Sequence, residues 1–173
     1  MRKEMPRKIH IIGPVGSGKT TLARKLSAKL SIPFYELDNV AWKRQVSGDI
    51  RRPEVEREAC LYEIIQSNCW IVEGVHNEDW VFPSFNHAEL IIFLNTNYNV
   101  RKYRIIKRFF LQKLRLEKSN YTPTVDIFIK MFKWNKYFEE ITKPDFLSKK
   151  LYKEKVMMIE KRSELQKLLN EVL

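Results

Sequence analysis

The sequence predicts an α/β fold in which helices cover both faces of a parallel sheet. Short, apolar and largely β-branched segments alternate along the chain with longer segments of helical periodicity, which is typical of strands joined by crossover helices. A glycine-rich segment at residues 13–20 joins the first such strand to the first helix. The length of 173 residues fits one domain, 1–173, with room for a small insertion.

Each expected element follows from its local pattern. The expected strands cover residues 8–12, 34–38, 69–74, 90–94 and 155–159. The expected helices carry apolar residues at intervals of three and four, and they cover residues 21–30, 54–67, a stretch beginning at 99, 127–138 and 163–173. We expect a loop at residues 42–52, a turn at residues 82–84 and a break between helices at residues 116–125.

The segment Gly13-Pro14-Val15-Gly16-Ser17-Gly18-Lys19-Thr20 matches G-x-x-x-x-G-K-[ST], the phosphate-binding loop or P-loop. Its glycines allow the backbone to wrap round phosphates with N–H groups pointing inward. The start of the following helix adds a partial positive charge. The strand before the segment and the helix after it supply the context that the motif requires. The predicted nucleotide-binding residues are Gly13, Pro14, Val15, Gly16, Ser17, Gly18, Lys19, Thr20 and Thr21.

Carboxylates at strand ends complete a predicted site for metal-assisted phosphoryl transfer. Lys19 would reach the β- and γ-phosphates, and the Thr20 hydroxyl would ligate Mg²⁺. Ligands of parallel sheets bind beyond the carboxyl ends of the strands, where Asp38, Glu73 and Asn95 are expected. Either carboxylate could hold Mg²⁺ or contact substrate, and a helix cap or structural hydrogen bond is the alternative. The predicted metal set is Thr20, Asp38 and Glu73.

Arginines recur along the helix that begins near residue 99. Arg101, Arg104, Arg108 and Arg115 share one face at helical spacing, while Tyr103, Ile106 and Phe110 occupy another. Arginine forks stabilise the charge that develops on a transferring phosphoryl group. We therefore predict Arg104 and Arg108 as catalytic residues together with Lys19. A solvated basic face is the alternative interpretation.

Aromatic residues offer surfaces on which a base could stack. Trp42, Trp134, Tyr137 and Phe138 are the candidates, although aromatic residues at helical spacing more often form core. Trp42, Asp38 and Glu73 form the predicted substrate set. His10 and His76 are expected to be structural.

Charge is unevenly distributed along the chain. Residues 1–90 hold 13 Lys and Arg against 12 Asp and Glu, whereas residues 91–173 hold 19 against 9, so the second half carries +10 of the net +11. A basic half attracts nucleotides, nucleic acid or acidic membranes, and it also occurs as an ordinary solvated surface. No helix-turn-helix, zinc-finger or aromatic RNA-binding motif is visible.

Composition predicts a cytoplasmic protein without a membrane partner. No apolar run reaches the length of a membrane span, and the basic start leads directly into the first strand without a secretory signal. Cys60 and Cys69 lack metal-ligand spacing and indicate a reducing compartment.

The whole chain resembles the adenylate-kinase-like P-loop kinases and, within them, the DNA topology modulation protein family. Four segments carry the resemblance: the P-loop at residues 13–20, Tyr35-Glu36-Leu37-Asp38 with Trp42, Trp70-Ile71-Val72-Glu73-Gly74, and the arginine-rich helix that begins near residue 99. It implies a P-loop NTPase fold with a five-stranded parallel sheet in the order 2-3-1-4-5, a helical lid at about residues 109–150, and the cofactors ATP and Mg²⁺. Adenylate kinases carry Asp-Gly-Phe-Pro-Arg after the third strand, whereas this chain has Glu73-Gly74-Val75-His76-Asn77.

Two functions fit these observations. The first is an ATP-dependent kinase acting on a small acceptor, with a nucleotide or a nucleoside as candidate acceptors. The second is a nucleotide-binding regulator that contacts DNA through its basic C-terminal half. Acceptor-dependent ADP formation would indicate the kinase, and strongly salt-dependent DNA binding would indicate the regulator.

Overall fold

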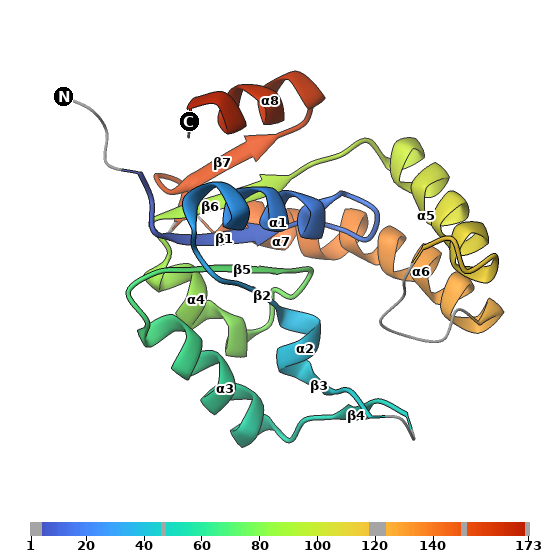
Figure 1. Cartoon of the computed structure of the whole chain (residues 1–173), viewed down its shortest axis with the longest axis horizontal. Helices are drawn as coiled ribbons and strands as arrows, with labels where there is room; N and C mark the ends of the chain where they lie inside the picture. Colours follow the sequence, from blue (N-terminus) through green and yellow to red (C-terminus); the bar gives the residue numbers. More distant parts are fainter. Residues whose placement is uncertain (1–4, 46–47, 118–123, 150–151, 172–173) are drawn as a thin grey trace.

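The structure, a computed structural model, describes residues 5–45, 48–117, 124–149 and 152–171. Its centre is a parallel sheet of five strands, namely β1 (Lys8–Ile12), β2 (Phe34–Glu36), β5 (Trp70–Gly74), β6 (Leu90–Leu94) and β7 (Val156–Ile159). They lie in the order β2-β5-β1-β6-β7 (Figure 1). Counted along the chain as first to fifth, this is the expected order 2-3-1-4-5, which is therefore confirmed.

Helices bury an apolar core on each face of this sheet. On one face α1 (Lys19–Leu30) and α8 (Arg162–Glu171) contribute Leu22, Leu26 and Leu168, which cluster with Ile9 and Ile11 of β1. The other face is covered by α3 (Glu54–Gln66), α4 (Phe82–His87), the π-helical turn η2 (Phe138–Thr142) and α7 (Lys143–Ser148). The prediction of helices on both faces is confirmed.

The second strand is shorter than expected. Residues 34–38 were predicted as one strand, but β2 ends at Glu36 and α2 (Leu37–Ala41) begins at the next residue. Leu37, Val40 and Ala41 are all buried in the core, which a helical turn achieves and an extended strand would not. Asp38 consequently lies in the first turn of a helix rather than at a strand end, and that part of the prediction was wrong.

Two other segments contain more structure than their sequence predicts. The segment 42–52, expected to be a loop, contains a small antiparallel pair, β3 (Trp42–Lys43) and β4 (Ile50–Arg51). The expected turn at 82–84 is instead the start of α4, which follows the 3₁₀ helix η1 (Asp79–Val81). Pro83 occupies the first turn of α4, where a missing N–H costs no helical hydrogen bond.

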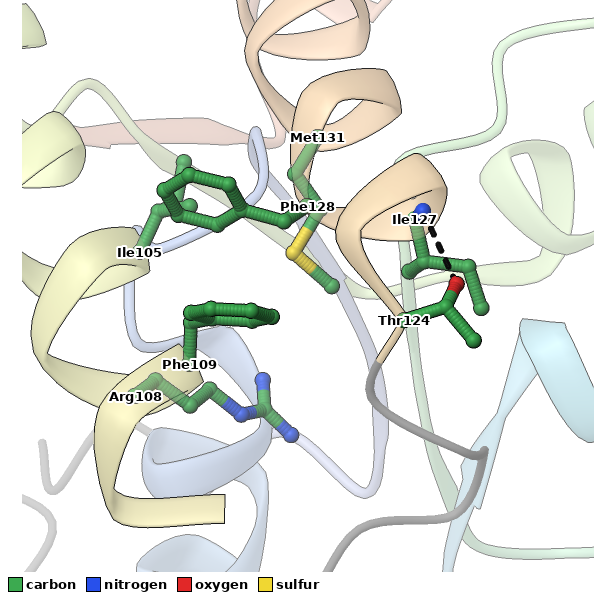
Figure 2. Close-up of a pocket in the computed structure, with 7 residues that line it drawn as sticks. All are labelled: Ile105, Arg108, Phe109, Thr124, Ile127, Phe128 and Met131. Carbon is green, nitrogen blue, oxygen red and sulfur yellow. Dashed lines mark hydrogen bonds between the residues drawn. The ribbon is translucent and has the colours of Figure 1, made fainter. Parts of the chain in front are cut away.

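The helices α5 (Tyr98–Lys113) and α6 (Val125–Tyr137) form a hairpin beside the sheet (Figure 1). The Phe109 and Phe128 rings pack between them with centroids 4.4 Å apart. A cavity of about 10 Å³ remains between the two helices, lined by residues of both and by Thr124, which caps α6 (Figure 2). This volume holds at most about one water molecule. Most of the predicted break at 116–125 lies outside the described residues.

The span expected to be a lid is not uniform. Phe138 and Phe146, which fall inside 109–150, are buried in the core beside Phe93 of β6. Within this span, α6 and the last residues of α5 stand away from the sheet (Figure 1). Across the described residues, no helix has both the length and the apolar character needed to cross a bilayer.

Candidate functional site

The P-loop connects the central strand β1 to α1 and depends on two glycines in left-handed backbone conformations. Gly16 has φ +77° and Gly18, which caps α1, has φ +97°. Such values strain any residue with a Cβ. A Cβ on Gly16 would also lie 3.0 Å from the backbone oxygen of Arg101 on α5. The loop is closed by the Ser17 N–H, which donates to the Pro14 carbonyl at 3.2 Å.

Lys19, Thr20 and Glu73 meet at the carboxyl end of the sheet. The Thr20 hydroxyl donates to Glu73 Oε1 at 2.5 Å, and Lys19 Nζ lies 3.5 Å from the Pro14 carbonyl oxygen. Glu73, next to last in β5, is only 3% exposed. Burial raises the pKa of its carboxyl group, while the Lys19 charge and the Thr20 hydrogen bond oppose that rise. The structure thus brings together three of the predicted site residues.

The donor groups at this point suit a magnesium ion that also binds phosphate. The described residues contain no ready-made group of three His, Cys, Asp or Glu side chains able to hold a metal. Magnesium needs none, because it usually keeps several waters and binds through one or two carboxylates together with substrate phosphates. The Thr20 hydroxyl and the buried Glu73 carboxylate supply hard oxygen ligands of that kind.

Asp38 belongs to a different set of contacts, centred on His76. His76 Nε2 lies 3.3 Å from Asp38 Oδ1, and its Nδ1 lies 3.2 Å from Glu78 Oε2. Burial opposes the imidazole charge, but the hydrogen bonds to the two carboxylates outweigh it and raise the pKa of His76 to about 9. The hydrogen bond from His76 in turn lowers the pKa of Asp38. A cationic His76 therefore holds an ionised Asp38 next to the Lys19 side of the site.

Sequence reasoning assigned His76 a structural role and thus missed its position in the site. It follows Glu73 by three residues, just beyond the end of β5, which is the one sequence signal that could have found it. The edge of its ring faces Trp80, with centroids 5.2 Å apart. The guanidinium of Arg57 also packs on Trp80, 4.6 Å from the ring centre. Among the described residues, the buried Arg57 Nε has no hydrogen-bond partner.

The remaining predicted substrate residue, Trp42, lies on the small β3–β4 ladder opposite Arg51 and is 38% exposed. Of the other aromatic candidates, Trp134 and Tyr137 are exposed on α6, whereas Phe138 is core. The Asn95 side chain donates to Glu160, beyond β7, at 2.7 Å. The aromatic and amide candidates are therefore not gathered at one point.

The arginines of α5 divide into three environments. Arg104 reaches the P-loop, where its guanidinium donates to the Gly16 and Ser17 carbonyls at 3.1 and 3.0 Å. Arg101 is buried and binds Asn135 at 2.7 Å and Glu139 at 2.5 Å, so it fastens α5 to α6 and η2. Arg108 lines the small cavity (Figure 2). Its side chain is 46% exposed, and its Nε lies 3.4 Å from Glu117 Oε1. Among the described residues of this helix, Arg104 is thus the arginine whose side chain donates hydrogen bonds to the P-loop.

The chain is similar to proteins named shikimate kinase, over a short stretch in sequence and over its whole length in fold. A 53-residue stretch is 36% identical to a shikimate kinase of Blochmanniella floridana, covering 25% of this chain and 29% of that protein. The aligned stretch therefore spans less than a third of that relative. Over whole chains, shikimate kinase from Acinetobacter baumannii in complex with shikimate has a TM-score of 0.56 and 22% identity, covering 96% of this chain and 92% of the other.

The fold is also similar to that of a deoxyadenosine kinase from M. mycoides with bound dATP, with a TM-score of 0.55 and 16% identity. The alignment covers 95% of this chain and 98% of the other. Likeness at these identities shows a shared fold. These comparisons do not extend to the DNA topology modulation family, so that part of the resemblance stays a prediction. The family model described as AAA domain matches residues 9–109, more than half of the sequence, and the chain belongs to the AAA domain family.

Proposed function

We propose that this chain is an ATP-dependent kinase that transfers a phosphoryl group to a small acceptor. The observation that carries this proposal is the meeting of Lys19, Thr20 and the buried Glu73 at the P-loop, beside a second carboxylate, Asp38. Phosphoryl transfer requires a cation, a pair of oxygen ligands for the metal, and a carboxylate on the acceptor side. Lys19, the pair Thr20 and Glu73, and Asp38 would supply these groups in that order. Similarity to proteins named shikimate kinase and deoxyadenosine kinase supports the same reaction class.

On the nucleotide side, the P-loop N–H groups and Lys19 would hold the phosphates of ATP. Thr20 and Glu73 would hold Mg²⁺, and the ion would supply positive charge that offsets the charge of the phosphates. Glu73 suits that role better than Asp38, because Glu73 already contacts Thr20 whereas Asp38 is engaged by His76. Arg104 would hold the P-loop backbone through the Gly16 and Ser17 carbonyls. From there it would stabilise the negative charge that develops on the transferring phosphoryl group. Arg108 lies one helical turn further along α5.

On the acceptor side, Asp38 would face the hydroxyl group that receives the phosphoryl. The His76 contact keeps Asp38 ionised and fixes its orientation. Trp42, partly exposed on the β3–β4 ladder, would stack against a flat group of the acceptor. A nucleotide or a nucleoside supplies such a group together with a hydroxyl, and these remain the acceptors that we test first.

The decisive experiment measures ADP release from MgATP in the presence of a panel of nucleosides, nucleotides, sugars and hydroxy acids. We expect at least one acceptor to raise ADP release well above the rate in buffer, and Lys19→Ala to abolish the increase. Separately, ATP binding should weaken when EDTA removes the metal. If the protein binds ATP but no acceptor of the panel raises the rate of ADP release, the kinase proposal is contradicted.

The DNA-contacting regulator remains the alternative hypothesis, although no observation on the fold or in the comparisons favours it. The same preparation tests it by titration with duplex DNA at several salt concentrations. A steep salt dependence, without acceptor-stimulated ADP release, would favour the regulator. The cytoplasmic location likewise stays a prediction.

A further inference from the structure

The α5–α6 hairpin exposes an unusual amount of apolar surface. Among the described residues, 19 large hydrophobic side chains are exposed, and 11 of them lie between Val100 and Ile141. Five of these form what we call the α5 stripe, with exposed fractions from 40% to 66%: Val100, Tyr103, Ile106, Phe110 and Leu114. Patches of this kind mark interaction surfaces on proteins that are otherwise well packed.

The α5 stripe is one continuous face of the helix and points away from its partner helix. Its members follow one another at intervals of three and four residues, so their side chains line up along the axis. The opposite face of α5 is the one that packs on α6, through the buried Arg101 and Ile105 and the ring of Phe109. Internal packing therefore does not account for the stripe.

The charge on the hairpin is almost entirely positive. The helix α5 contains six Lys and Arg and no Asp or Glu, and α6 contains three Lys and one Asp. Lys102 and Lys113 border the α5 stripe and Lys107 lies within it. Across the part of the chain that the structure describes, none of these three lysines lies within ion-pair distance of a carboxylate. A partner for this face must offer apolar groups to the stripe and negative charge to the lysines beside it.

We propose that the α5 stripe and its bordering lysines bind the surface of a bilayer that contains anionic phospholipids. An amphipathic helix with lysines beside an apolar face lies in the membrane interface, with its apolar side chains among the acyl chains and its cations at the headgroups. Our expectation of no membrane partner was based on the lack of a spanning segment, and a helix lying in the interface does not need one.

Two observations favour lipid over nucleic acid for this face. Three of the five stripe residues, Val100, Ile106 and Leu114, are aliphatic, whereas single-stranded nucleic acid is held by aromatic rings that stack on bases. The hairpin also stands out from the sheet as a pair of helices (Figure 1). A flat, anionic, apolar surface complements it better.

The test is co-sedimentation with vesicles of phosphatidylcholine alone or mixed with phosphatidylserine. The charge variant Lys107→Glu/Lys113→Glu is compared with Arg24→Glu/Lys25→Glu, which alters net charge equally at exposed positions of α1. The apolar variant Phe110→Ser is compared with Tyr62→Ser on α3, because the two rings are 58% and 59% exposed. Circular dichroism melts verify that each variant is folded.

We expect the unaltered protein to bind the phosphatidylserine vesicles, and to bind them more weakly as salt increases. Each basic residue near an anionic surface is worth roughly fivefold in affinity, so the α5 charge variant should bind at least about 25-fold more weakly. Phe110→Ser should also weaken binding, and both control variants should stay within about twofold of the unaltered protein. These results do not depend on the proposed kinase activity.

Three outcomes would overturn the proposal. The first is that the unaltered protein fails to sediment with phosphatidylserine vesicles, including the case in which it binds a single-stranded oligonucleotide instead. The second is equal binding to both vesicle types. The third is that Arg24→Glu/Lys25→Glu weakens binding as much as the α5 charge variant, which would indicate a response to net charge alone.

Discussion

The nucleotide side and the acceptor side of the candidate site are built in different ways. The P-loop is one continuous segment whose function rests on backbone conformation, on Gly16 and Gly18 and on a helix start. The acceptor side is assembled from separate elements, with Asp38 on α2, Trp42 on β3 and His76 after β5. A phosphate site can therefore be found from a local motif, whereas an acceptor site depends on tertiary contacts.

The largest expected effect comes from removing the charge on the nucleotide side. Lys19→Ala should lower turnover at least about 100-fold, because a fixed cation stabilises the charge of the transition state. The fold should be unaffected, since the described hydrogen bond of Lys19 Nζ is a long one to Pro14, at 3.5 Å. Kinetic assays with a circular dichroism melt check both statements. Normal turnover in a folded variant would refute the proposed role of the loop.

The two arginines of α5 should differ from each other. Arg104→Ala should lower kcat roughly 30-fold, with a smaller change in KM, because arginines that stabilise phosphoryl transfer act mainly in the transition state. Arg108→Ala should have an effect below about fivefold, because its side chain is 46% exposed and paired with Glu117. Steady-state kinetics on both single variants decide this. A larger effect at Arg108 would show that α5 moves during turnover.

Trp42→Ala should affect only the acceptor side. Loss of a stacking surface is worth about 1 kcal/mol at a partly exposed position, so KM for the acceptor should increase about fivefold. The affinity for ATP, measured by calorimetry, should stay the same. If ATP binding weakened instead, Trp42 would belong to the nucleotide side and the division between the two sides would fail.

An effect of similar size concerns stability and pH. The pKa of His76 rises from its ordinary 6.5 to about 9 on folding, so the folded protein holds this proton more tightly. The stabilisation is complete below pH 6.5 and is lost as the pH rises through about 9. We expect a loss of about 1 kcal/mol, because Asp38 and Glu78 are more than half exposed and water screens them.

Denaturant unfolding at pH 6 to pH 10 measures this loss. His76→Asn should flatten the curve in that window, and His87→Asn, at an exposed position of α4, serves as the matched control. An unchanged pH dependence in His76→Asn would show that the contacts with Asp38 and Glu78 contribute nothing to stability.

The sequence is sufficient for the sheet and the P-loop, because these depend on short apolar runs and on one local motif, whereas the strand order came from the resemblance to adenylate-kinase-like P-loop kinases. It is not sufficient for α2, since residues 34–38 read equally well as a strand until the burial of Leu37 and Val40 is known. Helical spacing placed Arg101 and Arg104 on one face, but it could not tell that α6 would cover Arg101 while Arg104 turned to the P-loop. His76 was missed because only the fold brings Asp38 to it.

The position of β1 in the middle of the sheet has a consequence for how the chain folds. Its residue Ile9 is synthesised early, yet its neighbours in the sheet are Ile71 and Leu90. Pairings between such distant residues close large loops and slow the search for the native state. Until β6 has left the ribosome, the apolar strand that leads into the P-loop lacks one of its two partners and is prone to aggregation. Folding of the nucleotide side therefore waits for sequence that lies far beyond it.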